Sequence, residues 1–237
     1  MNFFKKFFTS IIDLFYPRHC AGCQRALLEK EKFLCAGCEQ QLQPLTAPCC
    51  QVCSFPLVSV DLPTCSNCAE RKLHFIAGDS AFRYQGLMQE LLARYKYGHD
   101  QSLRPLLQEL IVAALQDERL QGVNFAGVVP VPLHPLRERE RGFNQVLPLA
   151  QEIAKQKKLP LQFLLKRKNP TRFQASFNRQ KRLENLEGVF ALRLPQQVHG
   201  NYLLVDDVLT TGSTLDECSK ILLEAGAQGV WAVVLAR

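Results

Sequence analysis

The chain has 237 residues, enough for one large domain or two modest ones, each able to bury a core. Its hydrophobic fraction of 47% and charged fraction of 22% are typical of an ordinary soluble globular protein. The net charge of +7 fits a polyanionic partner but does not choose between nucleic acid and a phosphorylated small molecule.

The segment 1–18 is predicted to form an amphipathic helix. Apolar side chains recur at helical spacing from Phe4 to Phe15, with Lys5 and Lys6 among them. The run is too short to span a bilayer, and no small-residue cleavage site follows it. We expect this helix to pack on the rest of the protein, with docking to a membrane surface or a partner as the alternative. Without an export signal, we expect a cytoplasmic protein that is not an integral membrane protein.

Residues 19–70 contain nine of the ten cysteines, and eight of these nine form four C-x-x-C pairs. The pattern C-x2-C-x11-C-x2-C occurs twice, thirty residues apart, and is an internal repeat. Cytoplasmic thiols stay reduced, so disulfides are not expected, and four pairs in register argue against a redox motif. Two C-x-x-C turns together offer the four sulfur ligands of a structural Zn2+. We predict a double zinc ribbon with two ions, whose ligands are Cys20, Cys23, Cys35, Cys38, Cys50, Cys53, Cys65 and Cys68.

Two pairings of these cysteines fit the spacing. In the sequential arrangement, which we favour, each repeat binds one ion; in the crossed arrangement the first pair joins the third and the second joins the fourth. Segments this short cannot build a core, so metal binding would supply much of their folding free energy. Cys49 is expected to be a bystander beside Cys50, with replacement of Cys50 as a ligand as the alternative.

Residues 71–237 alternate predicted strands and helices, a pattern typical of an α/β fold. Such folds contain a parallel sheet with helices on both faces, and ligands bind beyond the carboxyl ends of its strands. Strands or extended segments are predicted over residues 75–84, 127–131, 161–165, 189–192, 202–205 and 230–235. Helices are predicted over residues 86–97, 102–116, 144–157 and 213–225.

The segment after the strand 202–205 is the main candidate site. It begins with Asp206 and Asp207 and leads into a helix through Thr210, Thr211, Gly212, Ser213 and Thr214. Hydroxyls and backbone N–H groups at a helix N-terminus bind dianions, and a glycine lets the backbone approach the phosphate closely. The carboxylates do not favour a phosphate, so we expect them to face neutral hydroxyls or a metal-bound water. These features together describe a site for ribose 5-phosphate; a capped helix beside an acidic turn explains them less well.

The segment LLVDDVLTTGST resembles the signature of type I phosphoribosyltransferases, which bind phosphoribosyl pyrophosphate (PRPP) with Mg2+. The resemblance implies that Asp206 and Asp207 hold the ribose hydroxyls and that the residues from Thr210 to Thr214 hold the 5-phosphate.

Over the whole chain, further motifs resemble the ComF family of competence and DNA-utilisation proteins, including its GntX-like members. These motifs are the double cysteine repeat, RYKYG at 94–98, RGFNQ at 141–145, T-x-x-Q at 171–174 and R-x-x-N at 182–185. The resemblance implies a role in natural transformation, or in uptake or use of external DNA. It also implies handling of single-stranded DNA in the cytoplasm, with proteins of the DNA-uptake or helicase machinery as partners.

Residues 137–182 carry thirteen Lys or Arg against three acids, more positive charge than one pyrophosphate uses. Single-stranded nucleic acid needs such a basic groove. Arg141 is the first candidate for contact with the pyrophosphate, on a loop that glycine frees after the strand, and Lys96 is the second. The segment 168–181 resembles the mobile hood of relatives. Phe173 and Phe177 lie among its cations, either to stack on bases or to cover apolar surface.

Two functions remain open. The first is a ComF-like protein of DNA uptake or utilisation with a PRPP-binding domain and single-stranded DNA handling. The alternative is an active phosphoribosyltransferase that moves ribose 5-phosphate from PRPP to an unknown nitrogenous acceptor. In that reaction Mg2+ and Arg141 or Lys96 would assist the departure of pyrophosphate.

Overall fold

The computed structural model describes residues 18–168 and 188–237 of the chain. The predicted amphipathic helix lies outside the described residues except for Arg18, and the predicted hood does so except for Lys168. In the two described ranges, no helix has both the length and the apolar character needed to cross a membrane.

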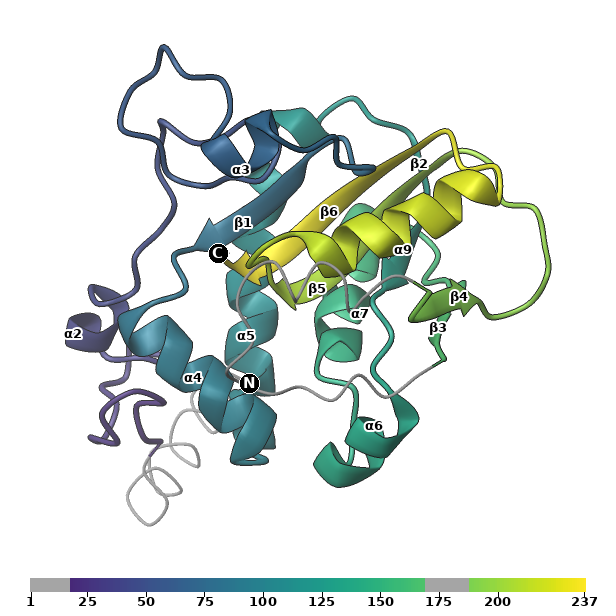
Figure 1. Ribbon diagram of the computed structural model, residues 1–237. Coiled ribbons are helices and arrows are strands. Elements are labelled where there is room, and N and C mark those ends of the chain that lie inside the picture. The colour runs from purple at the N-terminus through teal and green to yellow at the C-terminus, as the bar shows by residue number, and fades with distance from the viewer. Residues whose placement is uncertain (1–17, 169–187) are drawn as a thin grey trace.

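A four-stranded parallel sheet forms the centre of the fold (Figure 1). The strands run in the order β1-β6-β5-β2, at Gly78–Phe82, Gly229–Ala236, Asn201–Val208 and Phe125–Pro130. Three helices cover one face, namely α4 (Gly86–Tyr97), α5 (Arg104–Ile111) and α7 (Val146–Lys157). Helix α9 (Ser213–Glu224) covers the other face. The predicted α/β fold is therefore confirmed.

Shorter elements complete the described part of the chain. The helices are α2 (Ala36–Glu39), α3 (Ser66–Ala69) and α6 (Pro135–Arg141), and the 3-10 turns are Gln101–Leu103, Val112–Gln116 and Glu118–Leu120. An antiparallel pair consists of β3 (Leu165–Arg167) and β4 (Phe190–Leu192).

Several predicted elements have different bounds in the structure: the extended segment predicted over 161–165, for example, overlaps β3 only at Leu165. The single helix predicted over 102–116 is α5 between two 3-10 turns, because Pro105 fits only the first turn of a helix and the end tightens. Strand β5 continues to Val208, three residues beyond its predicted end. Asp206 and Asp207 are therefore part of the strand rather than of the loop after it.

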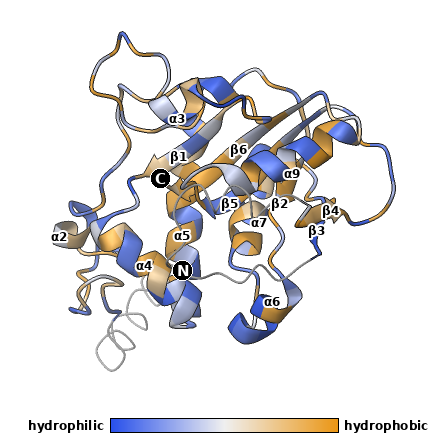
Figure 2. Ribbon diagram, viewed as in Figure 1, coloured by the Kyte–Doolittle hydropathy of each residue, from blue (hydrophilic) through white to orange (hydrophobic). Residues whose placement is uncertain are grey.

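Helix α6 replaces the loop predicted around Arg141. The ring Nδ1 of His134 accepts a hydrogen bond from the Leu136 N–H at 3.1 Å, Pro135 occupies the first turn, and Gly142 ends the helix at φ +75°. Arg141 therefore lies in the last helical turn. No residue of α6 is buried, and Figure 2 shows that it is largely hydrophilic.

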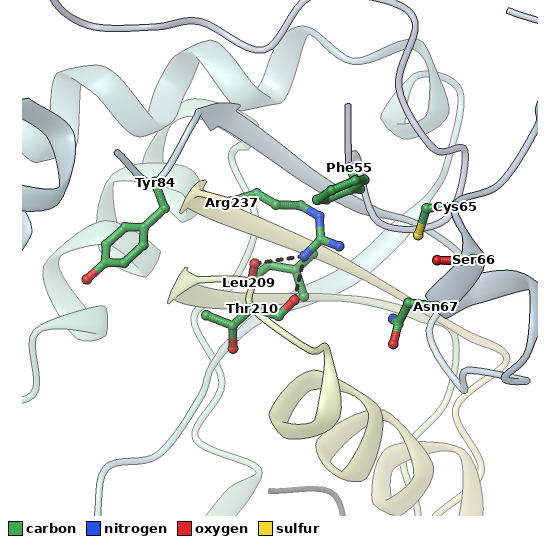
Figure 3. Close-up of a pocket in the computed structure, with 8 residues that line it drawn as sticks. All are labelled: Phe55, Cys65, Ser66, Asn67, Tyr84, Leu209, Thr210 and Arg237. Atoms are coloured by element: carbon green, nitrogen blue, oxygen red, sulfur yellow. Dashed lines mark hydrogen bonds between the residues drawn. The ribbon is translucent and has the colours of Figure 1, made fainter. Parts of the chain in front are cut away.

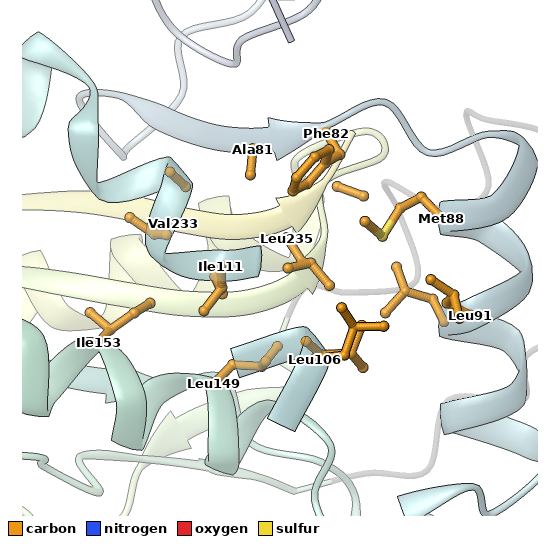
Figure 4. Packing of buried hydrophobic residues seen from close by; sticks show 14 of the residues in the cluster. Ala81, Phe82, Met88, Leu91, Leu106, Ile111, Leu149, Ile153, Val233 and Leu235 are labelled. Atoms are coloured by element: carbon orange, nitrogen blue, oxygen red, sulfur yellow. The ribbon is translucent and has the colours of Figure 1, made fainter. Parts of the chain in front are cut away.

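Alternate residues of β5 face opposite sides of the sheet. Leu203 and Val205 belong to the core on the side of α5 and α7, part of which Figure 4 shows. Leu204 belongs to the core on the other side, with Leu215 and Leu222 of α9. Two consecutive residues at the end of this strand must therefore point to opposite faces.

The two cysteine repeats extend these two cores separately. Cys20, Cys35 and Cys38 of the first repeat are buried in the core of α4, α5 and α7, whereas Cys23 is exposed. The four zinc-site cysteines of the second repeat are buried in the core of α9. Between the repeats, residues 43–45 pair with the outer edge of β1, where the Leu45 N–H donates to the Ala81 carbonyl at 3.0 Å. This pairing covers an otherwise open strand edge.

Candidate functional site

Each cysteine repeat brings its own four sulfurs together. Within each group all four Sγ atoms lie within 4.8 Å of one another. The distance between Sγ atoms is 3.7 Å for Cys23 and Cys35 and 3.6 Å for Cys53 and Cys65. Four sulfurs bound at about 2.3 Å to a tetrahedral zinc are about 3.8 Å apart, so the spacing fits the ion. The chain therefore has two four-cysteine sites for structural zinc, and the sequential pairing is confirmed.

Hydrogen bonds to the sulfurs suit zinc-bound thiolates. The backbone N–H of Cys35 donates to Cys20 Sγ at 3.3 Å, and that of Cys38 donates to Cys35 Sγ at 3.4 Å. Such donors offset the negative charge of a four-thiolate site. Cys49 lies outside both groups, and its thiol donates to the Thr46 carbonyl instead.

The predicted phosphate loop connects the end of β5 to the start of α9. Within the described residues, the backbone N–H groups of Thr210, Thr211 and Gly212 have no hydrogen-bond partner. The hydroxyls of Thr211 and Ser213 lie 2.8 Å apart at the first turn of the helix. Gly212 has φ +82°, a left-handed conformation that glycine adopts without strain. Free donors at a helix N-terminus form a set that suits a dianion.

Asp207 faces the side of the sheet that α4 and α7 cover. Its Oδ1 accepts a hydrogen bond from Lys96 Nζ at 2.8 Å, and its Oδ2 accepts one from Gln145 Nε2 at 3.1 Å. Burial lowers the pKa of Lys96, but the charge and hydrogen bond of Asp207 outweigh it and raise that pKa overall. Lys96 is thus paired with an aspartate of the predicted site. Gln145 belongs to the RGFNQ motif, but sequence analysis assigned it no role.

Asp206 faces the opposite side, toward α9. Within the described residues, its carboxylate accepts one hydrogen bond, from the Asp207 backbone N–H at 2.8 Å. Burial and the nearby charge of Asp207 raise the pKa of Asp206 to about 7. The two adjacent aspartates therefore have different surroundings: Asp207 is paired with Lys96, whereas Asp206 forms no ion pair with the residues that the structure describes.

Arg141 lies beside the end of α4. Its guanidinium sits over the ring of Tyr97, with 5.0 Å between the guanidinium carbon and the ring centroid. An open cleft of about 340 Å³ lies between α6 and β3, and Lys166, Arg167 and Arg193 are among the residues that line it. Cations that could contact a phosphate therefore lie in two places near the carboxyl ends of the strands. One is formed by α4 and α6, and the other lies at β3.

Two arginines that sequence analysis did not single out contact the phosphate loop. Arg237 donates to the carbonyls of Leu209 and Thr210, and Arg71 donates to the carbonyl of Thr211. Arg71 lies 140 positions before Thr211. No local sequence pattern predicts a contact over such a separation.

Two family models match the chain. Residues 11–69 match the model of a double zinc ribbon domain, and residues 145–237 match that of a phosphoribosyl transferase domain. Among solved structures, an allosteric regulatory enzyme of purine biosynthesis is 18% identical with a TM-score of 0.36, covering 56% of this chain and 25% of the other. For UMP synthase of Leishmania donovani the values are 16% and 0.33, with coverage of 61% and 24%.

Three similar curated proteins have related names. Competence protein F of Haemophilus influenzae is 32% identical over 62% of this chain, and competence protein ComFC of Streptococcus pneumoniae is 33% identical over 66%. DNA utilization protein YhgH of Escherichia coli is 32% identical over 65% of this chain. The matches span 66%, 66% and 69% of those proteins, respectively.

Proposed function

Because the chain belongs to the ComF family of competence and DNA-utilisation proteins, we propose that it binds PRPP or a related ribose 5-phosphate and handles single-stranded DNA during DNA uptake or utilisation. The observation that supports the sugar-phosphate part is that the backbone N–H groups of Thr210, Thr211 and Gly212, in the loop that follows Asp206 in the chain, have no hydrogen-bond partner among the described residues. A 5-phosphate accepts from such N–H groups, and a carboxylate accepts from ribose hydroxyls.

The residues present suit a magnesium–PRPP complex. Asp206 and the hydroxyls of Thr211 and Ser213 are oxygen ligands of the kind that Mg2+ and its waters prefer. Bound with PRPP, Mg2+ would neutralise charge on the pyrophosphate. Asp207 contributes differently, because its ion pair with Lys96 holds that lysine at the edge of the sheet. There the positive charge of Lys96 would attract the pyrophosphate of PRPP.

Calorimetric titration tests this site. We expect ribose 5-phosphate and PRPP, each with Mg2+, to bind the full chain with one site per molecule. Asp206→Asn should weaken binding by about tenfold or more, the loss of a charge-assisted hydrogen bond. The matched control is Asp61→Asn, an exposed aspartate in the second repeat, which should bind like the parent. No binding by the parent chain to either ligand would refute the proposal.

Single-stranded DNA binding is supported by exposed cations in the segment that follows α6 in the chain. Lys155 and Lys158 at the end of α7 and Lys166 of β3 are exposed. Binding of an oligonucleotide should weaken linearly in a plot of log affinity against log salt. Neutralising Lys155 and Lys158 to Gln together should lower the slope by about 1.4, which corresponds to two phosphate contacts. Lys30→Gln with Lys32→Gln, on the first repeat, is the matched control and should leave the slope unchanged.

Phosphoribosyl transfer is the second candidate, favoured by the position of Lys96 beside an aspartate of the site. Transfer would break the bond between the anomeric carbon and the pyrophosphate oxygen and form one from that carbon to the acceptor nitrogen, which would lose a proton. Lys96 and Arg141 would stabilise the charge on the departing pyrophosphate. PRPP-dependent release of pyrophosphate with an added nitrogenous acceptor, abolished by Asp206→Asn, would support it. If PRPP binds but no pyrophosphate is released with any acceptor tried, the first function is favoured.

A further inference from the structure

The second zinc site contacts the phosphate loop through one side chain. Arg237 Nη1 donates to the Leu209 carbonyl at 2.9 Å and to the Thr210 carbonyl at 2.7 Å (Figure 3). Its Nη2 donates to Cys53 Sγ at 3.0 Å. The guanidinium also lies over the ring of Phe55, at 5.1 Å from the centroid. One planar group thus connects a zinc ligand to two peptide carbonyls of the loop.

The backbone of Arg237 is itself fixed. Its N–H donates to the Phe82 carbonyl at 2.9 Å, and its carbonyl accepts from the Tyr84 N–H at 2.7 Å. The residue therefore continues the pairing of β6 beside β1. A side chain that starts from an anchored backbone and has three polar partners has little freedom to move.

A second arginine extends the same row of contacts. Arg71 follows the last zinc ligand of the repeat by three residues, and its Nη1 donates to the Thr211 carbonyl at 3.2 Å. Its Nη2 lies 3.7 Å from Asp216 of α9, which also accepts from the His74 backbone N–H at 2.6 Å. Three consecutive carbonyls of the loop, from Leu209 to Thr211, are therefore held from the side of the second repeat.

Peptide geometry gives this row a consequence. In a planar trans peptide, the carbonyl of one residue and the N–H of the next point in opposite directions. Carbonyls held toward the arginines therefore turn the N–H groups of Thr210, Thr211 and Gly212 away from them. These are the three N–H groups that have no partner within the described residues and that form the proposed phosphate cradle.

Zinc makes Cys53 a suitable partner for Arg237. A metal-bound cysteine is a thiolate, and four thiolates around Zn2+ carry a net charge of −2, which favours a guanidinium donor. A free thiol is only a weak acceptor. Loss of the ion would therefore weaken the hold of Arg237 and loosen a repeat too short to fold alone.

We propose that Arg237 and Arg71 are positioning residues for the phosphate loop and that the second zinc site, but not the first, sets its affinity for a sugar phosphate. This inference rests on the proposed function. An arginine that contacts the first repeat, Arg94 of α4, donates to the Ala21 carbonyl and to Asp100 Oδ2. Neither of these partners lies in the loop.

The test compares Arg237→Met with Arg94→Met in the full chain. Three quantities are measured: zinc per chain, unfolding temperature, and affinity for ribose 5-phosphate with Mg2+ by calorimetry. We expect two zinc ions in both variants, an affinity about tenfold lower in Arg237→Met, and an affinity within about twofold of the parent in Arg94→Met. Equal affinities of Arg237→Met and the parent would overturn the inference.

Arg237→Lys separates positioning from simple attraction between charges. Lysine keeps the positive charge but lacks the fork that reaches two carbonyls and a sulfur at once, so we expect this variant to stay about fivefold or more weaker than the parent. If Arg237→Lys bound the sugar phosphate as tightly as the parent, the positioning role of Arg237 would be overturned. If Arg237→Met does not fold, Arg71→Met gives the same comparison through the Thr211 carbonyl. A parent chain that does not bind the sugar phosphate would instead count against the proposed function.

Discussion

The two cysteine repeats have the same ligand spacing, and each forms one zinc site, yet they contact different parts of the protein. The first repeat packs on α4, where three of its four zinc-site cysteines belong to the core on one face of the sheet. The second packs against the phosphate loop and α9, in the core on the other face. The aspartates of β5 divide in the same way, since Asp207 faces the first core and Asp206 the second. The comparison teaches that the same cysteine spacing gives the same kind of zinc site. Which part of the α/β fold a zinc site contacts depends instead on the surface against which its repeat packs.

The strongest way to break this comparison is to remove one zinc at a time. Cys35→Ser and Cys65→Ser should each lose one ion, measured by atomic emission. Zinc contributes about 10–16 kcal/mol to the folding of isolated zinc-finger peptides, so both variants should unfold at clearly lower temperature. Only Cys65→Ser should lose more than about tenfold in affinity for ribose 5-phosphate, because only the second site holds the phosphate loop. Equal losses of affinity would show that the two sites act alike.

The next largest effect concerns the buried ion pair between Lys96 of α4 and Asp207 of β5. Lys96→Met should lower the free energy of unfolding by about 3–5 kcal/mol, because it leaves Asp207 buried without its cation. Urea unfolding measures the loss. Adding Asp207→Leu to Lys96→Met should restore much of the stability. No recovery in the double variant would mean that the ion pair is not the cause.

A smaller effect compares one glycine from each side. Gly212→Ala should cost about 1–2 kcal/mol, since alanine must adopt φ +82°. In the first repeat, Gly37 lies in the helix α2, and a Cβ added there would meet no atom within 4 Å. Gly37→Ala should therefore change stability by less than about 0.5 kcal/mol. Thermal unfolding of both variants checks this difference.

The smallest expected effect is a pH dependence on the Asp206 side. With its pKa at about 7, Asp206 is mostly ionised at pH 8 and mostly protonated at pH 6, so it accepts fewer hydrogen bonds from ribose at the lower pH. Affinity for ribose 5-phosphate should fall by up to about tenfold from pH 8 to pH 6. The ligand phosphate also titrates near pH 6. In Asp206→Asn only the ligand phosphate titrates, so affinity should change less with pH than in the parent. If the two proteins show the same dependence of affinity on pH, Asp206 is not its source.

Local patterns predicted the zinc sites and most of the sheet well. The spacing of eight cysteines was sufficient to predict two sites, because a C-x-x-C turn places two sulfurs at one ion regardless of the surroundings. Helix α4 has the predicted bounds, Gly86–Tyr97. Helix α6 was missed although Pro135 and Gly142 are ordinary signals of a helix start and end, because seven residues with no buried side chain give no hydrophobic period.

The contacts of the candidate site could not be predicted, because they join residues that lie far apart in the sequence. Asp206 and Asp207 were predicted as a pair with one role, but the period of two in a strand that continues to Val208 sends them to opposite faces. The partners of Asp207 come from α4 and from Gln145 just before α7, and those of the loop carbonyls come from Arg71 and Arg237. Each of these contacts depends on how the sheet is assembled, which no local pattern contains.

The pairing of residues 43–45 with the free side of β1 has a consequence for any attempt to trim the protein. A chain reduced to residues 71–237 would lose this cover and expose an edge strand that invites another chain to add on. It would also bare the apolar surfaces of α4 and of Phe75 and Leu209, on which the repeats pack. We therefore expect the α/β fold and the two zinc-binding repeats to fold as one unit, and the trimmed chain to self-associate unless a partner covers the surfaces it exposes.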